Sequence, residues 1–225
     1  MRILLVTEMR SGSTLFLQLL REAPGVQVLG EFLCWTDARA RARLQAAGVD
    51  ELLLRHRVDA AVDAVFARCA APVCIGKVHP EHVVFPATLT VAAAHVDRIV
   101  TLRRNVSTRV ASLRRALWTG HWEASPRLQR QRRIAGDAVC EKVGCWKDRT
   151  RAKALRLDEA LRTTVAWFSE AKRLRLPRLD VRSEAFFAEP DAEMRRVLRF
   201  LNVHANVSVY SAEEALGARM VPRAS

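Results

Sequence analysis

The chain has 225 residues, half of them hydrophobic, which is enough for one α/β domain with a substantial core. No segment approaches the roughly 20 apolar residues of a membrane-spanning helix, so the sequence predicts no transmembrane segment. The formal charge is +13, from 37 Lys and Arg against 24 Asp and Glu. A positive balance of this size indicates anionic partners, either nucleotides or larger polyanions.

The chain begins with the pattern of a strand, a polar loop and a helix. Residues Ile3 to Val6 predict a buried strand, and the loop from Glu8 to Thr14 contains one glycine. An amphipathic helix follows and stops at Pro24. A loop that leads into a helix N-terminus offers N–H donors and a favourable dipole, so this arrangement binds phosphate. After a first strand it indicates a nucleotide-type ligand over the end of a parallel sheet.

The loop itself, Arg10-Ser11-Gly12-Ser13-Thr14, lacks the lysine of a Walker A loop, and its one cation precedes the glycine. This argues against a magnesium-dependent NTPase. A polar turn with Ser11 or Ser13 as helix cap is the simpler interpretation. The run R-S-G-S-T-L resembles the 5′-phosphosulfate-binding loop of sulfotransferases that use 3′-phosphoadenosine-5′-phosphosulfate (PAPS). That resemblance implies that these five residues bind the donor.

The next part of the chain predicts helices and a second strand. Residues Thr36 to Ala70 have helical spacing, and we expect two helices broken near Gly48, with Asp50 as an N-cap. A short buried strand is expected from Val73 to Lys77. Residues Pro80 to His95 predict a further helix.

A second segment, from Arg98 to Trp122, strengthens the resemblance. Residues Ile99 to Leu102 predict a strand that ends at Arg103 and Arg104, before a helix. Sulfotransferases hold the 3′-phosphate with an Arg at a strand end and a Ser eight residues later, the spacing of Arg104 and Ser112. The resemblance implies a 3′-phosphate site here, with Arg103 beside it. Family members often read R-D-P at this point, whereas this chain reads R-N-V.

The tail of this segment, Thr119 to Trp122, resembles the T-G-x-W sequence of the bacterial trehalose sulfotransferase group. It lies in a basic region, in which residues 103 to 133 contain nine Arg and one acid, Glu123, a local balance of +8. Such a patch also fits nucleic acid, but no nucleic-acid recognition motif is present in the sequence. We expect a long basic loop or lid from Gly120 to Arg149.

The last elements complete the predicted fold. We expect a long helix from Ala152 to Leu174, a strand from Leu179 to Val181 and a helix from Pro190 to Leu201. The segment around Glu184 resembles the closing strand and helix of sulfotransferases, and we interpret this carboxylate as structural, bridging to basic partners.

The prediction is therefore one α/β domain over residues 1–225, with a mainly parallel central sheet flanked by helices in three layers. The resemblance covers about residues 3–203 and implies a P-loop-like fold, and residues 204–225 are expected to form an irregular tail.

Two residues compete for the role of general base. Glu31 lies 21 residues beyond Arg10, where the trehalose sulfotransferase group has a catalytic Glu. His79 lies in a segment that resembles the K-x-H-x-P sequence of cytosolic sulfotransferases, in which the His is the base. We favour Glu31, because the loop and the T-G-x-W tail match the same group. Lys77 is then a candidate for contacting the sulfuryl or bridging oxygen.

The five cysteines indicate neither a zinc site nor a disulfide framework. Cys140 and Cys145 lack a second pair of metal ligands, although a local disulfide between them is possible in an oxidising compartment. We expect free thiols in a reducing compartment. We accordingly expect a cytoplasmic protein, or a Golgi protein whose anchor lies outside this sequence.

The resemblance implies an enzyme that moves a sulfuryl group from PAPS to an acceptor hydroxyl, on a carbohydrate or other small molecule. It implies in-line transfer with a general base and no metal, by analogy with phosphoryl transfer. Its partners are the nucleotide donor and the acceptor, without specific nucleic acid. Two alternatives stay open: a P-loop-like nucleotide or sugar kinase, and a basic protein that binds nucleic acid or another polyanion.

Overall fold

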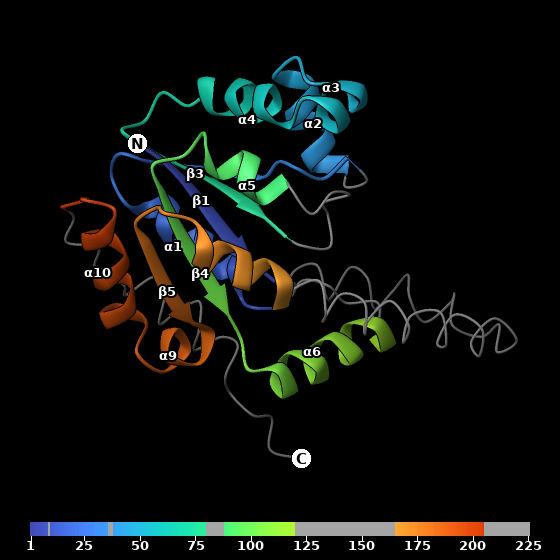
Figure 1. Ribbon diagram of the computed structural model, residues 1–225. Coiled ribbons are helices and arrows are strands. Elements are labelled where there is room, and N and C mark those ends of the chain that lie inside the picture. Colours follow the sequence, from blue (N-terminus) through green and yellow to red (C-terminus); the bar gives the residue numbers. More distant parts are fainter. Residues whose placement is uncertain (9, 36–37, 80–87, 120–164, 205–225) are drawn as a thin grey trace, which may run out of the picture.

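The computed structural model describes the chain except for residues 9, 36–37, 80–87, 120–164 and 205–225. In the described part, five strands form one sheet in the order β2-β3-β1-β4-β5. They are β1 (Arg2–Thr7), β2 (Val26–Glu31), β3 (Val73–Val78), β4 (Arg98–Arg103) and β5 (Arg178–Arg182). All neighbouring strands are parallel, so their carboxyl ends share one edge, here called the carboxyl edge (Figure 1).

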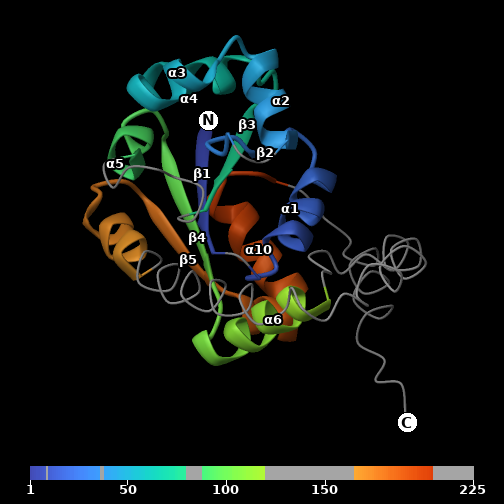
Figure 2. The ribbon, with the colours of Figure 1, turned by 90° about the vertical axis from the view of Figure 1, so that its right-hand side faces the viewer.

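Helices cover both faces of this sheet, because its side chains alternate between two apolar cores. In β1, Ile3 and Leu5 pack in the core beneath α1 (Ser13–Glu22) and α10 (Pro190–Phe200), whereas Leu4 and Val6 pack in the core on the other face. Figure 2 shows α1 and α10 on one side of the sheet, with α5 and the helical stretch 165–173 on the other. The remaining helices are α2 (Ala38–Ala46), α3 (Glu51–His56), α4 (Val58–Ala67), α5 (Thr88–Ala93), α6 (Val106–Thr119) and α9 (Ser183–Ala188). The domain is thus a mainly parallel α/β fold in three layers.

Most predicted elements are confirmed. The four expected strands correspond to β1, β3, β4 and β5, and the helices after the first and third of them correspond to α1 and α6. Asp50 caps α3, since its carboxylate accepts the Leu53 N–H at 2.7 Å. The long basic loop, the first part of the helix expected from residue 152 and the tail beyond residue 204 lie outside the described residues.

Three local predictions were wrong. The strand β2 was not predicted, because its residues are mostly half-buried and its pairing partner β3 is distant in sequence. The segment from 36 to 70 forms three helices instead of two, since the backbone leaves helical geometry at Arg57 between α3 and α4. The short helix α9 follows β5 directly and was not expected.

The cysteines also differ from the expectation of free thiols. A disulfide joins Cys69 and Cys74, because the turn between α4 and β3 brings their Cα atoms to 6.1 Å. Cys34 is buried, and Cys140 and Cys145 lie outside the described residues. Among the helices described, none has the length and apolar character needed to cross a membrane.

Candidate active site

The loop between β1 and α1 lies at the carboxyl edge and depends on left-handed backbone geometry. Arg10 has φ of 64° and Gly12 has φ of 88°. Gly12 is also the N-cap of α1, which corrects the expectation of Ser11 or Ser13. A Cβ atom at Gly12 would lie 2.5 Å from Cζ of Phe187. A side chain at the N-cap would therefore collide with the ring of Phe187. Because Gly12 has no side chain, it leaves the first-turn amides of α1 without a side-chain cap.

Ser11 holds the loop closed. It is fully buried, and its Oγ lies 2.6 Å from the Oγ1 of Thr7. Its backbone N–H donates to the carbonyl of Glu8, and its own carbonyl lies 2.5 Å from the Oγ of Ser183. Ser11 thus shapes the loop, whereas Thr14, in the first turn of α1, is exposed.

Three of the residues predicted to bind phosphate meet beside this loop. Arg104, just after β4, donates from Nη1 to the carbonyl oxygen of Arg10 at 3.0 Å. Arg10 in turn donates from Nε to the Oγ of Ser112, in α6, at 3.1 Å. Burial and, to a smaller extent, the positive charge of Arg104 lower the pKa of Arg10. Two guanidinium groups held this close favour an anion that would compensate both charges.

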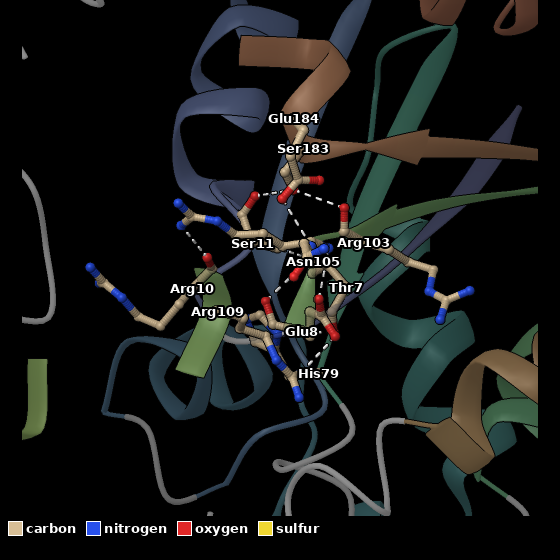
Figure 3. Close-up of polar contacts among 11 residues, drawn as sticks. Thr7, Glu8, Arg10, Ser11, His79, Arg103, Asn105, Arg109, Ser183 and Glu184 are labelled. Carbon is tan, nitrogen blue, oxygen red and sulfur yellow. Dashed lines mark hydrogen bonds and ion pairs between the residues drawn. The ribbon is translucent and has the colours of Figure 1, made fainter. Parts of the chain in front are cut away.

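Arg103 lies elsewhere. Its guanidinium packs over the ring of Phe168, 4.7 Å from the centroid, because consecutive strand residues point to opposite faces. Figure 3 shows its side chain directed away from that of Arg10. The structure therefore brings together Arg10, Arg104 and Ser112 but does not add Arg103 to them.

The two candidate bases and Lys77 form one hydrogen-bonded cluster. Glu31 and Lys77 are paired in the register of β2 and β3, and His79 lies two residues beyond Lys77, on the same side of the strand. Lys77 Nζ lies 2.5 Å and His79 Nε2 3.2 Å from the same carboxylate oxygen, Oε1 of Glu31. Lys77 and His79 are buried, and Glu31 is about a quarter exposed, at 24%. The residues are therefore partners rather than alternatives in space.

Both ring nitrogens of His79 contact oxygen atoms. Its Nδ1 lies 3.1 Å from the carbonyl oxygen of Thr7, which can only accept a hydrogen bond. Burial raises the pKa of Glu31, but the hydrogen bond from His79 and the charges of Lys77 and His79 outweigh it and hold that pKa far below 4.5. Because both oxygens accept, both ring nitrogens donate at once only when the His79 ring is an imidazolium. In this state Glu31 is the group with a lone pair to offer.

A β-bulge places Glu31 next to Lys77. The register of β2 and β3 shifts between Val28 and Gly30, and Gly30 has φ of 75°. The guanidinium of Arg43, from α2, lies against Gly30 and donates to the carbonyl of Glu31 at 3.0 Å. The bulge changes which residues face the cluster, as bulges beside active sites commonly do.

The cluster adjoins the loop between β1 and α1. Lys77 Nζ lies 3.4 Å from the Oγ of Ser13, at the first turn of α1. Lys77 is thus placed between the carboxylate of Glu31 and the start of the helix that follows the loop. An anion at this helix start could contact the ammonium group without a large movement of the backbone.

Two buried residues of this edge were missed from the sequence. Glu8 and Arg109 form an ion pair at 2.6 Å, and each side chain is only 5% exposed. The one signal in the sequence was an acidic residue inside a loop expected to bind anions. Glu184 was expected to bridge to basic partners. Its carboxylate instead accepts the backbone N–H of Asn105 at 2.9 Å.

Comparisons with known proteins add no assignment to this geometry. No protein-family model matches the chain, and the search of curated proteins finds no match. Within the residues that the structure describes, no group of three or more His, Cys, Asp or Glu side chains could hold a metal ion.

Proposed function

We propose that this chain is a PAPS-dependent sulfotransferase with a P-loop-like domain, acting on a hydroxyl of a carbohydrate or other small molecule. One observation carries the proposal: residues from two motifs about 90 positions apart meet beside a loop that adjoins a Lys–Glu–His cluster. Arg10 and Ser112 are in direct contact, and Lys77 reaches Ser13. An NTPase of the Walker type would need a lysine in the loop, which this chain lacks.

The described residues fit a donor with two anionic ends. The amides of the loop and of the first turn of α1 suit the 5′-phosphosulfate, since Gly12 leaves this helix start uncovered. Arg104 and Ser112 suit the 3′-phosphate, and Arg10 lies between the two ends. Guanidinium groups grip phosphate oxygens in a planar, bidentate manner.

The cluster fits the acceptor side of the reaction. PAPS supplies a sulfuryl group, whose bond to the phosphate oxygen breaks as its bond to the acceptor oxygen forms, leaving adenosine 3′,5′-bisphosphate. Glu31 takes the hydroxyl proton of the acceptor, and His79 orients the carboxylate. Lys77 contacts a sulfuryl or bridging oxygen. As its ammonium moves from Glu31 toward that anion, one charge that lowers the pKa of Glu31 is removed, so the carboxylate becomes a stronger base.

A three-way titration tests the proposal. The intact chain is titrated, by calorimetry, with adenosine 3′,5′-bisphosphate in the absence of metal, with ATP and magnesium, and with a single-stranded oligonucleotide. Tight binding of the bisphosphate alone is the expected result. Preference for ATP with magnesium would indicate a kinase, and preference for the oligonucleotide would indicate a polyanion-binding protein.

A further inference from the structure

The carboxylate of Glu8 joins two segments that the proposed function assigns to different phosphates. Glu8 lies in the loop after β1, where it is 4% exposed. Its Oε1 accepts the backbone N–H of Arg104 at 2.8 Å. Its Oε2 lies 2.6 Å from Nη1 of Arg109, and Figure 3 labels both of these side chains. One side chain therefore connects the phosphate loop to the end of β4 and to α6.

This connection fixes the two groups proposed for the 3′-phosphate. Arg104 supplies the amide that Glu8 binds, and Arg109 precedes Ser112 by three residues, which places both on neighbouring turns of one side of α6. The contacts of Glu8 thus help to set how far Arg104 and Ser112 lie from the loop, in addition to the direct contacts of these two residues with Arg10. Because Arg109 neutralises Glu8, the carboxylate leaves the loop suitable for an anion.

The backbone of this turn is already occupied by the protein's own acceptors. Glu184 accepts the N–H of Asn105 at 2.9 Å, and the side chain of Asn105 accepts the N–H of Ser107 at 3.0 Å. Together with the bond from Arg104 to Glu8, these contacts use the amides of Arg104, Asn105 and Ser107 at the start of α6. Three amides of this turn are thus bound by the protein itself, so the binding of a phosphate here depends more on the placement of side chains.

We propose that Glu8 is a positioning residue that sets the spacing between the two phosphate sites, an inference that rests on the proposed function. It acts through the Arg104 amide, and Arg109 holds it in place. Loss of the Glu8 carboxylate weakens the binding of ligands that need both sites at once, whereas ligands with a single phosphate keep most of their affinity.

A matched pair of double variants isolates this hydrogen bond. Both carry Arg109→Met, and position 8 is changed by Glu8→Leu in one and by Glu8→Gln in the other. Each double variant removes both members of the Glu8–Arg109 ion pair, and Gln retains an oxygen for the Arg104 amide. Glu184→Gln serves as the control, since Glu184 is exposed and binds the neighbouring amide of Asn105.

Affinities are measured for adenosine 3′,5′-bisphosphate, adenosine 5′-phosphate and adenosine 3′-phosphate. The Leu/Met variant is expected to bind the bisphosphate about tenfold more weakly, and each monophosphate within about twofold of the wild type. The Gln/Met variant and the control are expected to retain the wild-type preference for the bisphosphate. Equal bisphosphate affinities of the two double variants, or equal losses for all three ligands, would overturn the positioning role.

Hydrogen exchange without ligand separates this proposal from the proposed function. Peptides that cover residues 8–14 and 103–112 are expected to exchange faster in the Leu/Met variant than in the Gln/Met variant. If they do so while the wild type does not bind the bisphosphate, the sulfotransferase proposal fails and the spacing role of Glu8 toward the loop stands. Identical exchange in the two variants overturns the Glu8 proposal, whatever the wild type binds.

Discussion

The two halves of the carboxyl edge are built in different ways. In the arginine half (Arg10, Arg104 and Ser112), two contacts attach side chains to backbone, beside the side-chain contact of Arg10 with Ser112. Arg104 donates to the Arg10 carbonyl, and Glu8 accepts the Arg104 amide. In the carboxylate half (Glu31, Lys77 and His79), the short contacts converge from side chains on one carboxylate oxygen.

This difference matches the tasks of binding and of chemistry in the proposed function. Backbone-anchored groups lose little freedom when a ligand arrives, so they suit a site that recognises a fixed arrangement of charges. A carboxylate shared by two cationic side chains can exchange partners and change its basicity when one of them moves. We therefore expect changes in the arginine half to alter affinity and changes in the carboxylate half to alter turnover.

The largest effect is expected for Glu31→Gln. The amide keeps the shape of the side chain but cannot accept the proton, so turnover should fall by about 10²–10⁴-fold. Adenosine 3′,5′-bisphosphate affinity should be nearly unchanged, because the arginine half is intact. Turnover at saturating donor and calorimetric titration measure the two quantities, with thermal melting as the check of folding.

His79→Ala is the companion variant. If His79 orients Glu31, its loss should reduce turnover less than Glu31→Gln does. A larger loss in the His79 variant, with near-full activity in the Glu31 variant, would assign the base to His79. If both variants lose activity alike, the pH profile of each shows which group titrates.

Arg104→Ala should weaken bisphosphate binding by about 10- to 150-fold, the range of a charged hydrogen bond of roughly 1.5–3 kcal/mol. The loss for adenosine 5′-phosphate should be much smaller, since the proposed contact is with the 3′-phosphate. Arg103→Ala is the matched control, because Arg103 packs on Phe168 and should leave both affinities unchanged. Equal losses of both ligands in the Arg104 variant would remove the 3′-phosphate assignment.

Gly12→Ala tests how strongly the loop depends on its backbone. Both this glycine and Gly48 have positive φ, but a Cβ meets Phe187 at Gly12 and open space at Gly48. The left-handed conformation should cost Gly48→Ala about 1 kcal/mol of the free energy of unfolding. Gly12→Ala should cost about 2–3 kcal/mol, because the collision with the ring adds to the strain. Urea denaturation measures both, and equal costs would show that the ring moves aside freely.

The smallest expected effect concerns acid stability. The pKa of Glu31 is lowered in the folded protein from its ordinary value of 4.5, so below pH 4.5 the unfolded chain binds more protons than the folded one. The contribution of Glu31 to stability is therefore present above pH 4.5 and is lost as the pH falls toward the folded pKa. Urea denaturation is measured from about pH 5 to about pH 3. The free energy of unfolding should decline less steeply with falling pH for Glu31→Gln than for the wild type. An identical decline would mean that Lys77 and His79 do not stabilise the ionised carboxylate.

Local signals in the sequence were sufficient for much of the fold. The aliphatic runs of β1, β3 and β4 are almost completely buried, so their hydrophobic pattern is visible without knowledge of their partners. Asp50 caps α3 through a hydrogen bond three residues away, which is also a local interaction. The parallel α/β class followed from the alternation of such strands and helices.

Only the tertiary structure decided the features that depend on pairing between strands of the sheet. The strand β2 is half-buried and bulged at Gly30, and it forms against β3, about 45 residues later in the chain. That pairing brings Glu31 to Lys77 and places the two candidate bases in one cluster. The sequence by itself determined which residues have charged or hydroxyl side chains, and that a helix begins after the loop that follows β1. The fold decided which of them meet, because contacts between distant strand ends depend on strand order and register, which no local pattern records.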